Sequence, residues 1–451
     1  MIEPREEIYT GVWFLPGDSK RIQGRLTVSE NFIDLHLTDA DHHKFEEHDS
    51  LDLQEFPIIY GITQHKEFIT LYDCSGYFGD VSARLMLYGD IHFNVLADLK
   101  FQIMSINLPY FDKWLNPGSF EREISKTGFI IKYEQPEKIQ LDLNEEFELT
   151  IEFNCRIPDT RDKNRIVLNE YSTIQLISKN ENGSAISVFL KNLTFIQQFA
   201  SFMFRDGANI DTVRVYPNTG DFLKNRLMGT MVFSIFPFNK FANTDFKLHP
   251  IVPFDTIKES LQTIIQHWMI FAKNAQHIIQ LILQDYFHRG VFDENRFLNL
   301  IRALEIYHAF RFPGTILSPA DFKKKLDVIV ENIPDNYKKE VRAFLQYSNE
   351  PSLDNRLHAL LQELNGIKIG QDYIFDEQFV KNVKWSRNYY THYNPRSFKK
   401  ALKGQDLIKL TEACRSLINF LLLKDLQISN AQLAESFLYY FENSYYSNYF
   451  L

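Results

Sequence analysis

One stretch in the second half of the chain combines cations, aromatic rings and a histidine. Residues 381–403 (KNVKWSRNYYTHYNPRSFKKALK) contain seven Lys and Arg residues and no acidic residue. Cations bind phosphates and aromatic faces stack on bases, so this composition suits a single-stranded nucleic-acid site. The alternative is a solvated basic face beside a Tyr-rich core, which is the more common meaning of a charge run. The expected RNA contacts are Lys384, Trp385, Tyr389, Tyr390, Tyr393, Arg396, Lys399 and Lys400.

Within this stretch, Arg387 has the surroundings of a functional cation. A helix is predicted over residues 376–393, and Asp376 suits its N-cap. An arginine on an apolar stripe is either paired inside the fold or directed at an interface or a phosphate. The apolar residues that share the stripe with Arg387 are Phe379, Val380, Val383 and Tyr390.

His392 lies near the end of the same predicted helix. Pro395 stops the helix just beyond and moves Asn394 out of the helical conformation. A position near a helix C-terminus favours the imidazolium and raises the pKa of a histidine toward an acid–base range. Asn388 precedes His392 by four residues, so the two side chains can form a hydrogen bond.

The spacing of Arg387 and His392 predicts how a site must be assembled. A regular helix turns about 100° per residue, so the two side chains lie about 140° apart. One phosphate can touch both only if the helix end unwinds or a second copy of the chain contributes one of them. We therefore expect a site formed across a dimer.

A second pair, Arg302 and His308, has a similar spacing. Such pairs are expected by chance in a chain with this many Arg and His residues, so the spacing alone decides nothing. Glu305 follows Arg302 by about one turn, which predicts an internal ion pair and a structural role for Arg302.

The elements that must position these residues change character along the chain. Residues 1–250 form short alternating or apolar runs separated by turn residues, which predicts a β-rich, sandwich- or barrel-like region, with two lobes that divide near 120–140. After Pro253 the apolar period becomes helical, and residues 256–451 are predicted to be an all-α bundle. The fold class is therefore multidomain α+β. The later helices are expected at 335–347, 353–364, 376–393, 405–424 and 429–442.

Composition and charge narrow the function. The 451 residues suggest about two or three domains. Residues 1–255 carry 25 basic and 37 acidic side chains, whereas residues 256–451 carry 24 and 21. The resulting charges of −12 and +3 agree with the chain total of −9 and favour the second half for any phosphate site.

No cofactor or metal is expected. The chain has no P-loop, no Rossmann glycine fingerprint and no G-x-S-x-G elbow. The three cysteines are far apart and form no C-x-x-C pair, which excludes a zinc ribbon and fits a reducing compartment. Asp39–Asp49 is rich in Asp, Glu and His but lacks fixed ligand spacing, so a divalent metal there is a weaker alternative. Pro158-Asp159 is not followed by the acid-x-Lys of a metal nuclease.

The chain is expected to act in the cytoplasm. Its first seven residues carry a net negative charge and contain no apolar signal-peptide core. No run approaches 18 uninterrupted apolar residues, so no membrane span is predicted.

The residues Ser386–Asn394 (SRNYYTHYN) resemble the R-x(4–6)-H motif of HEPN ribonuclease domains. Asn388, the second residue of the motif, is polar, as that family prefers. Leu300–Tyr307 (LIRALEIY) resembles an earlier core helix of the same bundle. The layout is similar to ApeA-type anti-phage proteins, which join a β-rich N-terminal region, here opening with Gly11–Pro16 and Gly24–Leu26, to a C-terminal HEPN bundle.

The resemblance implies a metal-independent endoribonuclease that works as a homodimer with two motifs facing one cleft. In such enzymes the ribose 2′-OH attacks the adjacent phosphorus and leaves a 2′,3′-cyclic phosphate and a 5′-OH. His392 would carry the proton, Arg387 would stabilise the phosphate charge and Asn388 would orient His392. The implied role is antiviral defence by abortive infection, with RNA, plausibly tRNA, as the substrate and a phage-derived trigger as a partner.

Two other functions stay open on the residues alone. One is a non-catalytic helical module that binds or dimerises, and the other is a ligand-binding β domain for which the helices only supply dimerisation. If the chain is a nuclease, the N-terminal region would sense infection or restrain the bundle. If the helices only supply dimerisation, the N-terminal region would bind the ligand. Cleavage of RNA in EDTA separates the nuclease from both alternatives.

Overall fold

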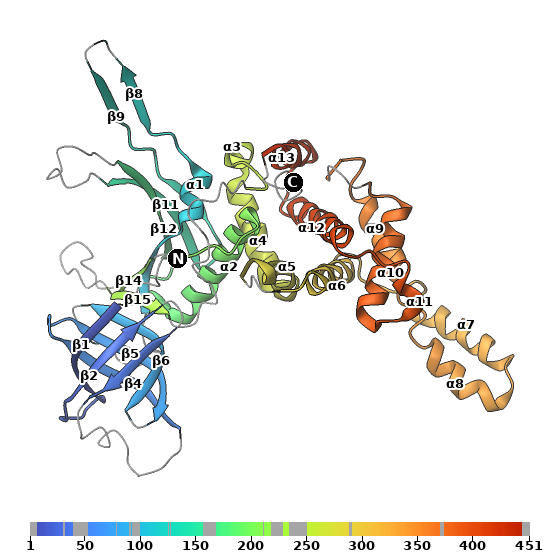
Figure 1. The fold of residues 1–451 in the computed structure, drawn as a ribbon, viewed down its shortest axis with the longest axis horizontal. Coiled ribbons are helices and arrows are strands. Elements are labelled where there is room, and N and C mark those ends of the chain that lie inside the picture. Colours follow the sequence, from blue (N-terminus) through green and yellow to red (C-terminus); the bar gives the residue numbers. More distant parts are fainter. Residues whose placement is uncertain are drawn as a thin grey trace. The chain divides into compact units, whose positions relative to one another are not determined.

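The computed structural model divides into two compact units. Met1–Pro250 and Glu259–Met269 form the β-rich unit, and Ile251–Lys258 and Ile270–Leu451 form the helical unit. Figure 1 shows the strands of the first and the helices of the second. The structure describes residues 7–29, 32–38, 53–77, 79–89, 92, 100–124, 126, 128–156, 168–210, 212–217, 229–233, 250–287, 291–369 and 374–443.

The β-rich unit begins with a closed barrel of six antiparallel strands. Following the hydrogen bonds, β1 pairs with β2, β2 with β3, β3 with β6, β6 with β5, β5 with β4, and β4 again with β1. Closure leaves no free sheet edge. The strands are β1 (Glu7–Phe14), β2 (Ile22–Val28), β3 (Ile33–Leu37), β4 (Gln54–Thr63), β5 (Phe68–Tyr77) and β6 (Asp80–Gly89).

Trp13 fills the centre of the barrel and explains two glycines. Its side chain is fully buried among Leu26, Ile59 and other apolar residues. A Cβ on Gly61 would lie 2.3 Å from the indole ring, and one on Gly24 would lie 2.8 Å from it. Both strands must therefore carry glycine where they pass Trp13.

A second set of strands follows the barrel in the order β10-β11-β12-β7-β14-β15, and β15 pairs with β6. The strand pairing changes after β6, while the expected division near 120–140 falls on a separate two-stranded ribbon, β8 (Phe120–Ile124) with β9 (Phe129–Tyr133). The remaining strands are β7 (Lys100–Asn107), β10 (Ile139–Asp142), β11 (Phe147–Arg156), β12 (Asn169–Ser178), β13 (Ser184–Ala185), β14 (Thr212–Pro217) and β15 (Gly229–Phe233).

The β-rich unit also contains a long helix that the sequence reading did not predict. In α2 (Ile186–Phe204), 14 of the 19 residues are buried. A helix buried on most sides has no continuous polar face, so its helical period is weak and its aromatic residues read as strand. A shorter helix, α1 (Pro109–Leu115), is far from α2 in the sequence but contacts it in the fold.

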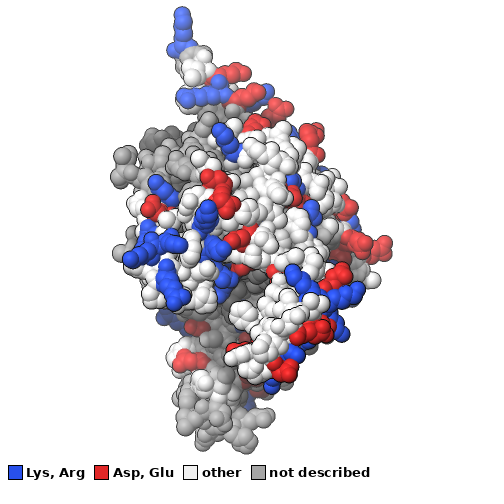
Figure 2. Space-filling model, turned by 90° about the vertical axis from the view of Figure 1, so that its right-hand side faces the viewer, with Lys and Arg blue, Asp and Glu red and all other residues white. Residues whose placement is uncertain are grey.

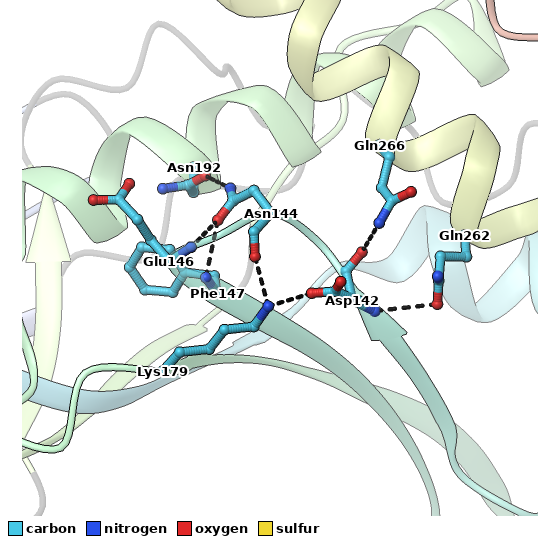
Figure 3. A network of polar contacts seen from close by, with 8 residues as sticks. All are labelled: Asp142, Asn144, Glu146, Phe147, Lys179, Asn192, Gln262 and Gln266. Carbon is cyan, nitrogen blue, oxygen red and sulfur yellow. Dashed lines mark hydrogen bonds and ion pairs between the residues drawn. The ribbon is translucent and has the colours of Figure 1, made fainter.

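The first part of α4 (Leu261–Asn274) packs with this unit. The buried Trp268 donates from Nε1 to the carbonyl of Phe195 at 2.7 Å and stacks on Phe202. Figure 3 shows the second anchor: the side chains of Gln262 and Gln266 bond the backbone of Asp142 at the end of β10.

The same network closes the turn between β10 and β11. Lys179 binds the carboxylate of Asp142 and the carbonyl of Asn144 (Figure 3). Asn144 accepts from the backbone of Glu146 and Phe147. Residues 259–269 thus belong structurally to the β-rich unit, although they are helical.

The helical unit confirms the expected all-α character of the second region. Its observed helices lie within a few residues of those predicted, and Ser318 caps α7 through a bond from the amide of Asp321, with Pro319 as the first helical residue. The elements are α3 (Phe254–Ile257), the 3₁₀ turn Lys258–Ser260, the end of α4, α5 (Gln276–Phe287), α6 (Asp293–Arg311), α7 (Pro319–Glu331), α8 (Asp335–Leu345), α9 (Leu353–Gln362), α10 (Glu377–His392), α11 (Pro395–Phe398), α12 (Gln405–Asp425) and α13 (Asn430–Asn443).

The core of the helical unit lies between α6 and α12. Phe297, Leu300 and Leu304 of α6 are fully buried, as are Leu417 and Leu421 of α12. Helices α5, α9 and α10 also contact α6, and α10 contacts α12 as well. Among the described residues, no helix is long and apolar enough to cross a membrane.

Candidate active site

Helix α10 carries the Arg387–His392 pair, and its start is well defined. Asp376 accepts hydrogen bonds from the amides of Gln378 and Phe379, as expected for an N-cap. The apolar side of the helix is buried through Phe379, Val380, Val383 and Tyr390. This burial fixes which side of the helix faces out.

The chain after α10 folds back onto the same helix. The backbone amide of Leu402 donates to the hydroxyl of Ser386 at 3.0 Å, and the carbonyl of Leu402 accepts from the hydroxyl of Tyr390 at 2.9 Å. Ser386 is fully buried at this contact. Tyr390 is also buried, so its ring is not available for the RNA contact that was expected of it.

Arg387 is paired with a carboxylate from α6. Its Nη2 lies 3.4 Å from Oε1 of Glu305, and the two side chains are 33% and 25% exposed. Its Nη1 lies 3.5 Å from Oδ1 of Asn388. The expected ion pair between Arg302 and Glu305 is not formed, because Arg302 points into solvent and Glu305 faces α10 instead.

His392 is the last residue of α10 and is exposed. The following residue, Tyr393, is left-handed with φ 47°, and its amide still donates to the carbonyl of Tyr389. Asn394 is extended, as expected before Pro395, and caps α11 through a bond from the amide of Arg396.

The helix end does not unwind between Arg387 and His392. Helical structure is continuous from Glu377 to His392, so the angle of about 140° between the two positions stands. The expected hydrogen bond between Asn388 and His392 is not formed in this part of the structure; Asn388 contacts Arg387 instead. The first of the two ways to bring both side chains to one phosphate, an unwound helix end, is therefore not present in this structure.

Cations cover the aromatic faces beside the pair. The Lys400 ammonium lies 4.0 Å from the centre of the Trp385 ring, and the Lys403 ammonium lies 3.4 Å from that of Phe398. Tyr389 packs edge-on against Tyr393 and Phe398. Lys403 and Phe398 were not among the expected RNA contacts, although both lie in the basic stretch of residues 381–403.

The remaining expected RNA contacts differ in their exposure to solvent and in whether they are already paired. Tyr393 is 65% exposed, and Arg396, Lys399 and Lys400 are exposed as well. Lys384 is held by the carboxylate of Asp354 on α9 at 2.5 Å. A phosphate at Lys384 must therefore compete with Asp354. In the view of Figure 2, Lys and Arg side chains are most numerous at the left, with some acidic side chains among them, and both signs also mix at the right.

The second pair is divided between solvent and core. His308 is buried on α6, packs on the ring of Phe312, and its Nδ1 has no hydrogen-bond partner among the described residues. Burial lowers the pKa of His308, and the charge of Arg356 lowers it further. Arg302 is exposed. These two residues do not form a joint site within one chain.

Two segments weighed in the sequence lie outside the described residues. They are Asp39–Asp49 and the Pro158-Asp159 pair. Glu305 was missed as a site residue because its partner Arg387 lies 82 positions away.

Comparison with known families places both halves of the chain. The family described as ApeA N-terminal domain 1 matches residues 8–268, and the family described as Apea-like HEPN matches residues 298–432. Searches of curated proteins and of solved structures found no match. The first match ends where α4 stops packing with the β-rich unit, and the second spans α10 with Arg387 and His392. Since the first match alone covers more than half of the chain, this protein belongs to the ApeA family and joins an ApeA-type N-terminal domain to an ApeA-like HEPN domain.

Proposed function

We propose that this chain is an anti-phage endoribonuclease whose helical unit cleaves RNA in a cleft shared by two copies. The family match supports a HEPN nuclease of antiviral defence. The observation that carries the proposal is the placement of Arg387 and His392 on one unbroken helix, beside exposed cations and rings. The cell compartment consistent with this role is the cytoplasm.

The chemistry needs one proton carrier and one cation. The ribose 2′-oxygen attacks the adjacent phosphorus as its proton leaves, the bond to the 5′-oxygen breaks, and that oxygen gains a proton. His392 carries the proton at one of these oxygens, and its exposure leaves it accessible to the substrate. The products are a 2′,3′-cyclic phosphate and a 5′-OH, and DNA is spared because it lacks the 2′-OH.

Arg387 stabilises the charge that builds on the non-bridging phosphate oxygens. Its planar guanidinium donates two parallel hydrogen bonds to such a group. In the resting chain one side of this fork lies against Glu305, so RNA must take the place of that carboxylate. Asn388 supports the orientation of Arg387, since its amide oxygen lies beside Nη1.

The partner copy completes the site. Arg387 and His392 point in directions about 140° apart on an intact helix, so one phosphate receives Arg387 from one copy and His392 from the other. This arrangement makes the homodimer the active species. The RNA contacts that we propose around it are Lys384, Trp385, Tyr389, Tyr393, Arg396, Lys399, Lys400 and Lys403.

The β-rich unit is proposed to hold the nuclease inactive until infection. Its residues carry most of the negative charge of the chain, which makes it a poor RNA surface. A phage-derived trigger then releases activity, and tRNA is the proposed target. In cells, the full-length chain should be toxic only on infection, and His392→Ala should remove that toxicity; toxicity of the variant equal to wild type would contradict the nuclease role.

The direct test is cleavage of tRNA in EDTA by full-length protein purified from phage-infected cells, in which the proposed restraint is released, with analysis of the product ends. We expect cyclic-phosphate ends from wild type and none from His392→Ala. Cleavage that requires a divalent metal, or that leaves 5′-phosphates, would favour another chemistry. A folded wild-type protein that binds RNA without cutting it under activating conditions would favour the non-catalytic alternative.

A further inference from the structure

The barrel carries an aromatic box on its outer face, and the box encloses the imidazole of His92. Phe14 at the end of β1 lies opposite Tyr60 on β4, and Phe68 begins β5. Successive residues of a strand point to opposite faces, and Trp13 points into the barrel core. Phe14 and its neighbour Tyr60 therefore point outward, where they meet His92.

The three rings hold the imidazole as a floor and two walls. The rings of His92 and Tyr60 are stacked, with centroids 4.4 Å apart and an angle of 11° between planes. Phe14 and Phe68 meet the imidazole edge-on at 5.4 Å and 4.9 Å. Stacked and perpendicular contacts of this kind select for a flat, unsaturated ring.

The polar contact of His92 defines the ring further. Its Nε2 lies 2.8 Å from the carbonyl oxygen of Gly61. Because a carbonyl can only accept, Nε2 donates a hydrogen. Burial lowers the pKa of His92, the hydrogen bond to Gly61 partly opposes this, and nearby Arg21 lowers the pKa as well. The His92 imidazole that fills the box is thus a neutral, planar heterocycle with an N–H donor. A nucleobase is also a neutral, planar heterocycle, and its edge also carries N–H donors.

Arg21 adds a cation at the rim of the box. Its guanidinium lies 3.4 Å from the centre of the Phe14 ring. One nitrogen, Nη1, donates to the carbonyls of Asp18 and Lys20. The Nε and Nη2 donors of this exposed side chain have no partner among the described residues. They are placed to receive a phosphate.

We propose that Phe14, Tyr60 and Phe68 form the base-binding site for a mononucleotide, which His92 occupies in the free protein. The incoming base replaces the stacking of His92 on Tyr60 and donates to the Gly61 carbonyl, while its phosphate binds Arg21. The base takes over the hydrogen bond that His92 makes to the Gly61 carbonyl, and the phosphate contact is gained. This site belongs to the β-rich unit and does not depend on the ribonuclease proposal.

The test uses the full-length His92→Ala variant, whose box is emptied of its own ring. Imidazole and then AMP, GMP, CMP and UMP are titrated, and thermal stability and heat of binding are measured. We expect imidazole and at least one mononucleotide to bind this variant saturably. Wild type should bind the same nucleotide about tenfold more weakly or worse, because His92 must first leave. His65→Ala, which removes an exposed histidine of the same barrel, should behave as wild type.

Two further variants keep the outcome decisive. Adding Tyr60→Ala to His92→Ala removes the floor of the box and should abolish binding, and Arg21→Gln should weaken mononucleotides but not imidazole. A folded His92→Ala variant that binds neither imidazole nor any of the four nucleotides would show that the box is packing alone. Binding that survives Tyr60→Ala would place the nucleotide elsewhere and also overturn the proposal.

If His92→Ala does not fold, the native chain supplies the answer. The ring resonances of His92 are followed by NMR while each mononucleotide is added. Movement of these resonances that Arg21→Gln suppresses supports the exchange. Resonances that stay fixed at every concentration contradict it.

Discussion

The two Arg–His pairs of the helical unit have almost the same spacing and opposite surroundings. On α10, His392 is exposed at the helix end and Arg387 is partly covered by the carboxylate of Glu305. On α6, His308 is buried and Arg302 is free in solvent. A proton carrier must reach the substrate and a phosphate-binding arginine must be held in place, so we propose the α10 pair, and not the α6 pair, as the reaction centre.

The largest expected difference between the pairs is catalytic. His392→Ala and Arg387→Ala should each lower RNA cleavage by about 10²–10⁴-fold, the usual contribution of a general acid–base group or an oxyanion-stabilising donor. Arg387→Lys should rescue poorly because it loses the planar fork. Single-turnover cleavage by the full-length protein purified from phage-infected cells measures both effects.

Arg302→Ala is the matched control for that experiment. It removes an exposed arginine of the same unit and should leave the cleavage rate unchanged. Loss of activity in a folded Arg302→Ala or His308→Ala protein, with His392→Ala still active, would mean that the α6 pair is the catalytic one.

The second difference concerns stability. His308→Ala removes a buried ring that packs on Phe312 and should lower the free energy of unfolding by about 1–3 kcal/mol. Urea unfolding measures the loss. Cleavage per folded molecule should stay near wild type. Equal stability of His308→Ala and wild type would remove the structural role assigned to His308.

The third difference is a dependence of stability on pH. Burial and Arg356 lower the pKa of His308, so the unfolded chain binds this proton more readily than the folded chain. The contribution is fully present above the ordinary value of 6.5 and is lost as pH falls from 6.5 toward the lowered pKa. In the His308→Gln variant, the free energy of unfolding should therefore change less with pH over this range below 6.5. An unchanged slope in the variant would assign the acid sensitivity to other groups.

The smallest expected effect comes from the carboxylate that covers Arg387. Glu305→Gln frees the guanidinium, and a partly exposed ion pair is worth about 0–1 kcal/mol. RNA should therefore bind up to about fivefold more tightly, as measured by titration with the inactive His392→Ala background. Weaker binding would mean that Glu305 positions Arg387 for the phosphate instead of competing with it.

The helical unit and the β-rich unit also differ in how much of their structure could be predicted from the sequence. Amphipathic helices such as α10 were predicted within a few residues because their apolar stripes repeat, and Asp376 and Pro395 mark the ends. Helix α2 was missed because burial on most sides removes that repeat. The partners of Arg387 and Lys384 are 82 and 30 positions away, and such pairs depend on how helices pack. The burial of Tyr390 likewise depends on the returning chain at Leu402.

The central claim is that each reaction centre takes Arg387 from one copy and His392 from the other. It is tested most directly by co-expressing the full-length Arg387→Ala and His392→Ala chains, each inactive alone, in phage-infected cells and measuring RNA cleavage by the mixed dimers. In a mixed dimer, one centre combines the intact His392 of the first chain with the intact Arg387 of the second. Random pairing makes half the dimers mixed, and one of two centres in each is intact, so we predict about a quarter of wild-type activity. Mixed dimers as inactive as either parent would contradict the shared centre.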